Sequence, residues 1–339
     1  MRILVTGAGG MLGRDMTLEL AARRHDVVAL AHGDLDIADI GAVRERVSTL
    51  RADLVVNCAA YTRVDDAEQD RETAFATNAL GPRNLALACR WVDAVLLHIS
   101  TDYVFDGEKG KPYTIWDLPS PLNVYGASKW WGENYVRSLL PEHYLVRTSW
   151  LFGEHGRNFV TTMLRMANEC NADKAGSAAT ARALRRSGCG ARDVDERASV
   201  PLERRRTAAG GERTPPCGRQ HIQVVTDQQG SPTYTVDLAK ACADLLETGC
   251  FGIYHVTNQG VTSWYEFARA IFAHIGVTVD VRPITSDEFV RPARRPRNSA
   301  LDPYPLRETI GYLLPSWEDA LVRFLGHVSQ GQGQGQGQG

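Results

Sequence analysis

Short apolar runs alternate with segments whose apolar residues recur every three or four positions, most regularly in the first half of the chain. A short apolar run predicts a buried strand, whereas the three-to-four spacing predicts a helix that is apolar on one face. The strands expected from this pattern are residues 3–6, 26–30, 53–57, 94–99 and 143–147. The expected helices are residues 11–22, 70–92 and 125–139.

Strands that are apolar on both faces and alternate with amphipathic helices are typical of a parallel sheet covered by helices on both sides. We therefore expect an α/β fold with a doubly wound, Rossmann-type parallel sheet over residues 1–169. Ligands of such sheets bind beyond the carboxyl ends of the strands, so the catalytic and binding residues are expected at that edge.

The pattern resumes after residue 220 in shorter elements. The expected strands are residues 222–225 and 253–256, and the expected helices are residues 234–247, 263–275 and 316–326. We expect these elements to form a smaller C-terminal lobe over residues 221–328 that binds the substrate, with some elements returning to the Rossmann domain.

Two segments depart from the pattern. Residues 170–220 are rich in Arg, Ala and Gly and contain four residues of the types Leu, Val, Ile, Met, Phe, Trp and Tyr. So few apolar residues cannot offset the entropy lost on ordering, so we expect a disordered insertion. The segment has ten Arg and one Lys against six acidic residues, so it could be a basic arm that binds an anionic partner. The alternatives are a passive insertion and sequence read from a shifted reading frame. Residues 329–339, mostly a Gly-Gln repeat, are expected to be a disordered tail.

Charge and cysteine content narrow the class of protein. The 339 residues carry a formal net charge of −2, which gives no global attraction to nucleic acid or to an anionic membrane. The seven cysteines form no CxxC pair and no metal-ligand spacing, which favours free thiols in a reducing compartment. We expect a cytoplasmic enzyme, a monomer or a homodimer, with no metal, no nucleic-acid partner and no membrane span.

The loop after the first expected strand is rich in glycine. Gly7, Gly10 and Gly13 have the spacing GxxGxxG, and the helix that follows the strand begins with Met11 and Leu12. Glycines here permit a tight turn and a close approach of the backbone to a pyrophosphate at the helix N-terminus. The loop therefore predicts dinucleotide binding, and a glycine-rich turn without a ligand is the alternative.

The end of the second expected strand bears on which dinucleotide binds. An acidic residue there would favour NADH through the adenosine ribose, and a basic residue would accommodate the 2′-phosphate of NADPH. Ala31-His32-Gly33 follows this strand, offering no acid and a single phosphate partner, His32. We expect NADPH, with NADH as the alternative, and Asp36 as a contact to the adenine.

Tyr125 and Lys129 are four residues apart in an expected helix, so they share one face. A tyrosine hydroxyl has an ordinary pKa of about 10, and a nearby ammonium group would lower that pKa towards the working range. This spacing is common by chance, but Ser100-Thr101-Asp102 also ends an apolar strand. A hydroxyl at the strand end would reach the same substrate oxygen as Tyr125. We therefore expect a hydride-transfer centre formed by Thr101, Tyr125 and Lys129.

These features together resemble the extended short-chain dehydrogenase/reductase family and, within it, the dTDP-4-dehydrorhamnose reductases. The strings that carry the narrower resemblance are NCAAYTRVD at 57–65, STDYVFDG at 100–107, RTSWLFG at 147–153, DQQGSPT at 227–233 and RPRNS at 295–299. The likeness covers residues 1–169 and 221–327, and the segment 170–220 has no counterpart in it.

The resemblance implies reduction of the 4-keto group of dTDP-4-dehydrorhamnose to give dTDP-L-rhamnose. It implies that Tyr125 protonates the developing alkoxide, that Lys129 lowers the pKa of Tyr125 and binds the nicotinamide ribose, and that Thr101 hydrogen-bonds the reacting oxygen. Besides the glycine loop, the residues it implies around the cofactor are Met11, Leu12, His32, Asp36, Ala59, Ala60, Tyr61, Asn78, Ser100, Tyr125 and Lys129. Those it implies around the substrate are Val64, Thr101, Asp102, Trp150, Asn158 and, for the diphosphate, Arg295.

Other interpretations stay open on the sequence. Trp150 follows a buried strand and could be core, and Arg295 lies in an arginine-rich stretch where one side chain could be a solvated charge. A sister ketoreductase for another dTDP-deoxysugar or a branched sugar of a natural product would share the fold and the chemistry. A catalytically silent, NADP-binding regulatory subunit would share the fold but not the activity. The regulatory subunit of methionine adenosyltransferase, which resembles this family, is an example of such a protein. The complete catalytic set argues against that last alternative.

Overall fold

The computed structural model describes the backbone of residues 1–169 and 221–334 and the side chains of residues 1–169 and 221–329. The expectation of a disordered insertion over 170–220 lies outside the described residues. Among those that are described, no helix is both long and apolar enough to cross a membrane.

A parallel sheet of six strands forms the centre of the molecule. Its strands, in the order in which they lie side by side, are β10 (Gly252–His255), β5 (His143–Thr148), β4 (Val95–Thr101), β3 (Leu54–Asn57), β1 (Arg2–Thr6) and β2 (Asp26–Leu30). The chain winds outward from β1 to β2, then returns and adds the remaining strands on the other side of β1. This confirms the doubly wound α/β sheet expected from the sequence. The reversal between β1 and β3 is where ligands bind in such folds.

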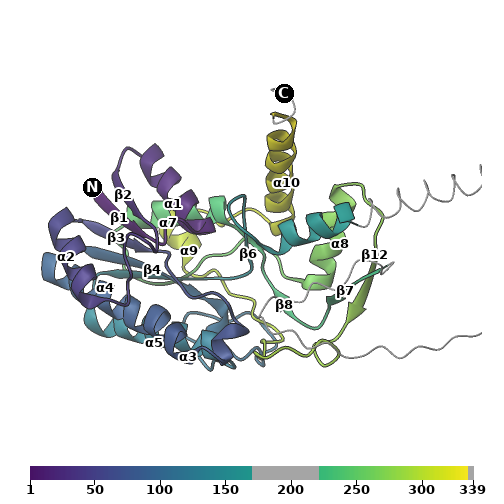
Figure 1. Ribbon diagram of the computed structural model, residues 1–339, viewed down its shortest axis with the longest axis horizontal. Coiled ribbons are helices and arrows are strands. Elements are labelled where there is room, and N and C mark those ends of the chain that lie inside the picture. The colour runs from purple at the N-terminus through teal and green to yellow at the C-terminus, as the bar shows by residue number, and fades with distance from the viewer. Residues whose placement is uncertain (170–220, 335–339) are drawn as a thin grey trace, which may run out of the picture.

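Helices cover both faces of the sheet (Figure 1). On one face α1 (Met11–Ala22) packs against α7 (Thr235–Leu246) over the apolar side chains of β1, β3 and β5. On the other lie α2 (Ile40–Leu50), α4 (Gly81–Val92) and α5 (Val124–Leu139). Helix α7 and strand β10 come from the C-terminal half of the chain, so the two halves share one core.

The pattern of apolar residues missed helix α2. Its buried side chains are Val43 and Val47, one turn apart, which is too few for a recognisable apolar stripe. The helix begins at Asp39, whose carboxylate accepts hydrogen bonds from the backbone N–H groups of Gly41 and Ala42. This N-cap satisfies donors that the first helical turn leaves free.

The long helix expected over residues 70–92 is interrupted. Helix α3 (Arg71–Phe75) passes through a π-helical turn, η2 (Ala76–Leu80), into α4. The π turn shifts the register of the helix and brings the backbone of Asn78 against α5 at Gly132. A Cβ atom on Gly132 would lie 2.2 Å from the carbonyl oxygen of Asn78. Such π turns often occur at functional sites.

A smaller lobe packs beside the sheet (Figure 1). It contains three two-stranded sheets and the helices 159–169, α8 (Trp264–His274) and α10 (Trp317–Gln334). The strand pairs are β7 (His221–Val225) with β12 (Asp280–Ile284), β8 (Gln229–Gly230) with β11 (Thr262–Ser263), and β6 (Leu151–Phe152) with β9 (Thr233–Tyr234). Phe152, Tyr234, Phe267 and Phe324 form the centre of its core.

The C-terminal helix is longer than expected. The sequence predicted a helix over 316–326 and a disordered tail from 329, whereas α10 continues to Gln334. Each residue added to an existing helix gains a backbone hydrogen bond, which offsets part of the cost of the glycines in the Gly-Gln repeat. The rest of the tail, 335–339, lies outside the described residues.

Candidate active site

The glycine loop between β1 and α1 forms a cradle that side chains would fill. Gly7 has a φ of +68°, and a Cβ atom on it would lie 2.5 Å from the backbone nitrogen of Ala59. A Cβ atom on Gly13 would lie 2.2 Å from the carbonyl oxygen of Gly7. Gly10 precedes α1, and no side chain of the described residues caps the helix N-terminus. A compact cradle at a free helix N-terminus fits a dinucleotide pyrophosphate.

Two residues expected near the cofactor, Met11 and Leu12, have different surroundings. Leu12 is buried in the core beneath the sheet, so only its backbone faces the loop. Met11 is half-buried, and its sulfur lies 3.6 Å from the side-chain nitrogen of Asn158. Met11 therefore joins the glycine loop to the lobe.

Asn158 was expected to contact the substrate, but its side chain is engaged within the protein. Its Oδ1 accepts a hydrogen bond of 3.0 Å from the backbone of Thr161, which caps the helix 159–169. Its Nδ2 donates to the carbonyl oxygen of Gly153 at 2.8 Å. Asn158 is therefore an N-cap, because Asn is favoured where the first turn of a helix leaves N–H groups free, and its contact with the substrate stays a prediction.

His32 and Asp36 lie in the exposed loop that follows β2. The carboxylate of Asp36 accepts a hydrogen bond from the backbone N–H of Ala38, so it stabilises its own turn. The amide of Asn84 on α4 donates to the carbonyl oxygens of Ile37 and Ala38 at 3.0 and 2.9 Å and fixes the loop from below. Asn84 gave no signal in the sequence, because its partners lie 46 and 47 residues away.

The segment Ala59-Ala60-Tyr61 after β3 is held by Asn78. The Asn78 Oδ1 accepts from the backbone N–H of Tyr61 at 2.8 Å, and its Nδ2 donates to the Tyr61 carbonyl oxygen at 2.9 Å. The same Nδ2 lies 3.0 Å from the hydroxyl of Ser128 on α5. Asn78 is fully buried, so it positions a segment of the site. Val64 lies further along the same loop and is half-buried.

The structure brings Thr101, Asp102 and Tyr125 together. Thr101 ends β4, and its hydroxyl donates to the Asp102 carboxylate at 3.0 Å and hydrogen-bonds the phenol of Tyr125. Helix α5 approaches this strand end closely because residue 126 is glycine. A Cβ atom on Gly126 would lie 2.1 Å from the carbonyl oxygen of Tyr103. The strand-end hydroxyl and the tyrosine expected from the sequence therefore face one another.

The pKa of Tyr125 differs from the expectation. Burial raises it above the ordinary tyrosine value, and the negative charge of Asp102 adds to the increase. Lys129 was expected to lower this pKa, but its ammonium group donates to the carbonyl oxygen of Ile99 at 2.6 Å. Burial also lowers the pKa of Lys129 to about 8. The effect of burial on the pKa of Tyr125 outweighs the lowering expected from a lysine one helical turn away, so the phenol is protonated at neutral pH.

A buried ion pair lies behind Lys129. Glu133, one turn further along α5, receives two hydrogen bonds from the guanidinium of Arg147, at 2.9 and 2.6 Å. Ser100, expected beside the cofactor, donates its hydroxyl to the same carboxylate at 2.5 Å. The charge of Glu133 partly offsets the effect of burial on the pKa of Lys129. No motif of the sequence indicated this pair, although Tyr125, Lys129 and Glu133 repeat every four residues.

Asp102 is a buried carboxyl group that faces the same centre. Burial raises its pKa to about 7, although hydrogen bonds from Ser299 and Thr101 oppose the shift. Its Oδ2 has no hydrogen-bond partner among the described residues. Near neutral pH this group is therefore partly protonated and can either donate or accept a hydrogen bond.

Arg295 was expected to bind the substrate diphosphate, and in the structure its guanidinium is paired. It forms two hydrogen bonds with the carboxylate of Asp65, at 2.9 and 3.0 Å, and another with the phenol of Tyr103. Arg291 binds the same carboxylate at 3.0 Å. A half-buried arginine requires a counter-charge, which the sequence could not show because Asp65 lies 230 residues away. A diphosphate would therefore compete with Asp65 for this side chain.

Trp150 is half-buried and lies two residues after the end of β5. Its ring stacks on the ring of Trp264, with a centroid distance of 3.6 Å and an interplanar angle of 5°. The sequence left open a contact with the substrate and plain core packing. The ring is half-buried and stacks on Trp264, and its contact with the substrate stays a prediction.

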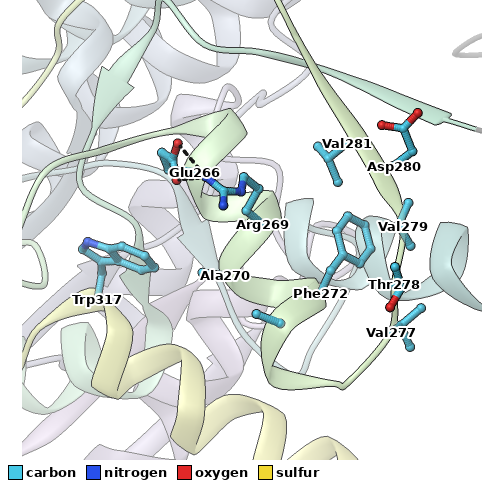
Figure 2. A pocket seen from close by; sticks show the side chains of 11 residues that line it. Glu266, Arg269, Ala270, Phe272, Val277, Thr278, Val279, Asp280, Val281 and Trp317 are labelled. Atoms are coloured by element: carbon cyan, nitrogen blue, oxygen red, sulfur yellow. Dashed lines mark hydrogen bonds and ion pairs between the residues drawn. The ribbon is translucent and has the colours of Figure 1, made fainter.

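A cavity of about 600 Å³ lies elsewhere, in the outer part of the lobe (Figure 2). Figure 2 shows its lining on α8, on the strand that follows it and at Trp317, with an ion pair between Glu266 and Arg269 at its rim. Its lining includes no residue of the glycine loop and none of Thr101, Tyr125 and Lys129. It is therefore separate from the centre described above.

Known proteins share both the sequence and the fold. The family described as RmlD substrate binding domain matches residues 1–177 and 216–330, so the match leaves out residues 178–215. A dTDP-4-dehydrorhamnose reductase of Mycolicibacterium smegmatis is 40% identical over 94% of this chain and 84% of its own. A dTDP-4-keto-6-deoxy-D-glucose reductase of Streptomyces niveus is 36% identical over 95% of this chain and 96% of its own.

A solved structure agrees with these relatives. The dTDP-4-dehydrorhamnose reductase of Bacillus anthracis, in complex with NADP, superposes with a TM-score of 0.80 at 37% identity. The superposition covers 96% of this chain and 99% of that one. The family match covers most of the chain, the relatives align along nearly all of it, and the glycine cradle and the Thr101–Tyr125 pair lie at one sheet edge. This chain belongs to the RmlD family, the family of the dTDP-4-dehydrorhamnose reductases.

Proposed function

We propose that this protein reduces the 4-keto group of dTDP-4-dehydrorhamnose to give dTDP-L-rhamnose, with NADPH as the reductant. The contact between Thr101 and Tyr125 at the carboxyl end of β4, beside the buried Lys129, carries the proposal. The names of the relatives supply the substrate class.

The residues at this edge have separate tasks. When bound, the nicotinamide supplies the hydride that the keto carbon accepts. Tyr125 donates its phenolic proton to the carbonyl oxygen as negative charge develops there, and Thr101 donates a hydrogen bond to that oxygen. The raised pKa of Tyr125 keeps its proton in place until then. Lys129, next along the helix, stabilises the phenolate that remains.

The glycine cradle, the segment Ala59-Ala60-Tyr61 and Lys129 would hold the cofactor. NADPH is favoured over NADH by the NADP complex of the Bacillus anthracis relative. The exposed His32 after β2, where an NADH-selective fold would carry an acid, supports the same choice.

We further propose that the lobe over 221–328 binds the sugar nucleotide and that the enzyme acts in the cytoplasm as a monomer or a homodimer. The free thiols of the four described cysteines support a reducing compartment.

A direct assay tests the reaction. Purified protein, dTDP-4-dehydrorhamnose and NADPH should give loss of the reduced-nicotinamide absorbance together with dTDP-L-rhamnose. Tyr125→Phe should lower kcat by about 10²–10⁴-fold, because it removes the proton donor. NADPH affinity should change little in this variant. Protein that binds both ligands and oxidises no NADPH would contradict the proposal.

A sister ketoreductase is the second candidate, favoured by the Streptomyces niveus relative, whose name gives a different dTDP-keto sugar. The fold and the proton-transfer residues would be the same, so the test is product analysis. Rates with several dTDP-4-keto sugars, compared by kcat/KM, distinguish the two. A silent regulatory subunit is a third alternative, and it would show no turnover that Tyr125→Phe could remove.

A further inference from the structure

A row of buried polar side chains crosses the sheet beneath the glycine loop. Thr6 is paired with Asn57 in the register of β1 and β3, and Asn57 is paired with His98 in the register of β3 and β4. Side chains in register on neighbouring strands project from the same face of a sheet. All three are at most 1% exposed. Polar groups buried this deeply need hydrogen-bond partners, so their contacts show what they hold in place.

The side-chain amide of Asn57 has one possible orientation. Its Oδ1 accepts a hydrogen bond of 3.1 Å from the backbone N–H of Ala59 and another of 2.8 Å from the hydroxyl of Thr6. A backbone N–H can only donate, so the amide oxygen must face Ala59 and the amide nitrogen must face away from it. That nitrogen, Nδ2, lies 3.0 Å from Nδ1 of His98.

The orientation of the amide fixes the tautomer of His98. Because Nδ2 of Asn57 can only donate, Nδ1 of His98 must accept and therefore carries no proton. Burial and the positive charge of Lys129 hold the pKa of His98 well below its ordinary value, so the ring is neutral and its proton lies on Nε2. Nε2 has no hydrogen-bond partner among the described residues. Within the described part of the chain, the ring thus makes its polar contact through Nδ1.

Ala59 connects this row to the glycine loop. A Cβ atom on Gly7 would lie 2.5 Å from the backbone nitrogen of Ala59 and 2.7 Å from its Cα, so the loop rests directly on this residue. The backbone nitrogen that Gly7 contacts is the one that donates to Asn57. A change in the Asn57 amide would therefore displace the surface that supports the loop.

We propose that His98 is a positioning residue for the dinucleotide. Its unprotonated Nδ1 holds the amide of Asn57 in the orientation that binds Ala59, and the backbone of Ala59 in turn supports Gly7. His98 acts through Asn57 and touches neither cofactor nor substrate in this role. The inference rests on the proposed function in one respect, namely that the glycine loop binds NADPH.

The first test compares two variants of His98 by titration of protein fluorescence with NADPH. His98→Leu removes the acceptor and leaves a buried donor of Asn57 without a partner, so NADPH should bind roughly tenfold more weakly. His98→Gln offers a side-chain oxygen that can accept from Asn57, and its NADPH affinity should lie within threefold of wild type. The KM for the keto sugar should change less than threefold in both variants.

His143→Leu is the matched control. It also removes a buried imidazole from the sheet, at the start of β5, where Nδ1 of His143 lies 2.6 Å from the carbonyl oxygen of Leu140. The strands are parallel, so this position lies at the edge opposite the glycine loop. The control should melt at a lower temperature and bind NADPH as wild type does. Equal weakening of NADPH binding in His143→Leu and His98→Leu would overturn the proposal, because loss of sheet stability would then explain both.

Three further measurements report on the contacts themselves. A long-range ¹H–¹⁵N spectrum of wild type should show the His98 proton on Nε2. Hydrogen exchange at the amide of Ala59 should be at least about tenfold faster in His98→Leu than in wild type and unchanged in the control. In an Asn57→Ala background, His98→Leu should change NADPH affinity little, since the two effects are then non-additive. A proton on Nδ1, unchanged exchange at Ala59 or additive effects would each contradict the proposed role.

Failure of this inference and failure of the proposed function give different results. The titration, the tautomer and the exchange rate need no turnover and no sugar, so they test His98 even if the protein reduces a different keto sugar. Wild type that does not bind NADPH overturns the proposed function and the role of His98 in binding. Wild type that binds NADPH no more tightly than a folded His98→Leu variant overturns the role of His98 alone.

Discussion

At the scale of single residues, the site is built from ionisable groups held in a dry environment. Lys129 and Asp102 are each 2% exposed. Burial lowers the pKa of Lys129 and raises the pKa of Asp102, so it favours the uncharged form of both groups. The Glu133–Arg147 pair beside them satisfies its own charges with two hydrogen bonds. Water-poor surroundings strengthen the interactions that these groups make with a reacting oxygen, at a cost in stability.

The cost of burying Asp102 should appear as a difference between wild type and Asp102→Asn in how the free energy of unfolding depends on pH. The pKa of Asp102 is raised from 3.8 to about 7, so the folded protein holds an extra proton between those values and loses stability as the pH rises through them. The variant lacks this loss. Relative to wild type it should gain on the order of 4 kcal/mol in the free energy of unfolding between pH 4 and pH 8.

Urea unfolding of both proteins at several pH values measures the difference. Wild-type and variant curves that run parallel across this range would show that Asp102 is ionised in the folded protein. The comparison cancels the titration of the other groups, because both proteins share them.

At the scale of elements, the strand–loop–helix unit of β1 and α1 depends on two close backbone contacts. Gly7 lies against the backbone of Ala59, and Gly13 lies against the carbonyl oxygen of Gly7. The glycine spacing between an apolar run and an amphipathic helix predicted this unit, because both signals are local in sequence. The interrupted helix over 71–92 was not predicted, since the π turn is set by contacts between Asn78, Tyr61 and Ser128 from three separate segments.

Gly13→Ala should disable cofactor binding while leaving a folded protein. Its Cβ atom would lie 2.2 Å from the carbonyl oxygen of Gly7, so the loop must move and the cradle changes shape. NADPH affinity should fall at least about tenfold, equivalent to 1.4 kcal/mol, in a titration of protein fluorescence.

The control is Gly326→Ala in α10, where a Cβ atom meets open space. The control should bind normally and gain about 0.5–1 kcal/mol in stability. Equal NADPH affinities for the two variants would contradict the role of the loop.

At the scale of the whole molecule, the chain crosses repeatedly between the sheet and the lobe. Strand β10 joins the sheet and α7 covers it, whereas β7 and the helix 159–169 belong to the lobe core. Residues 169 and 221, which flank the segment 170–220, thus lead into the same hydrophobic cluster. Among the described residues, the helix 159–169 and β7 thus pack into one core from the two sides of the segment.

Replacing 170–220 by a linker of about six residues should leave kcat/KM unchanged or improved. For the disordered insertion that the sequence predicts, shortening this connection from 51 residues to six is about three halvings, which stabilises the folded state by roughly 2 kcal/mol of closure entropy. Steady-state kinetics and a melting curve check both expectations. Loss of activity in a variant that still melts cooperatively would show that the segment contributes a contact to the site.

The sequence by itself determined the parallel sheet, the glycine loop and the pair of Tyr125 and Lys129, because apolar periodicity, turn chemistry and helical spacing are local properties. Tertiary structure decided what these groups experience. Burial raises the pKa of Tyr125. The fold also places the Lys129 ammonium group against a backbone carbonyl and pairs Arg295 with a carboxylate 230 residues away. It also stacks Trp264 on Trp150. Desolvation and contact are set by which distant segments meet, and no local pattern encodes that.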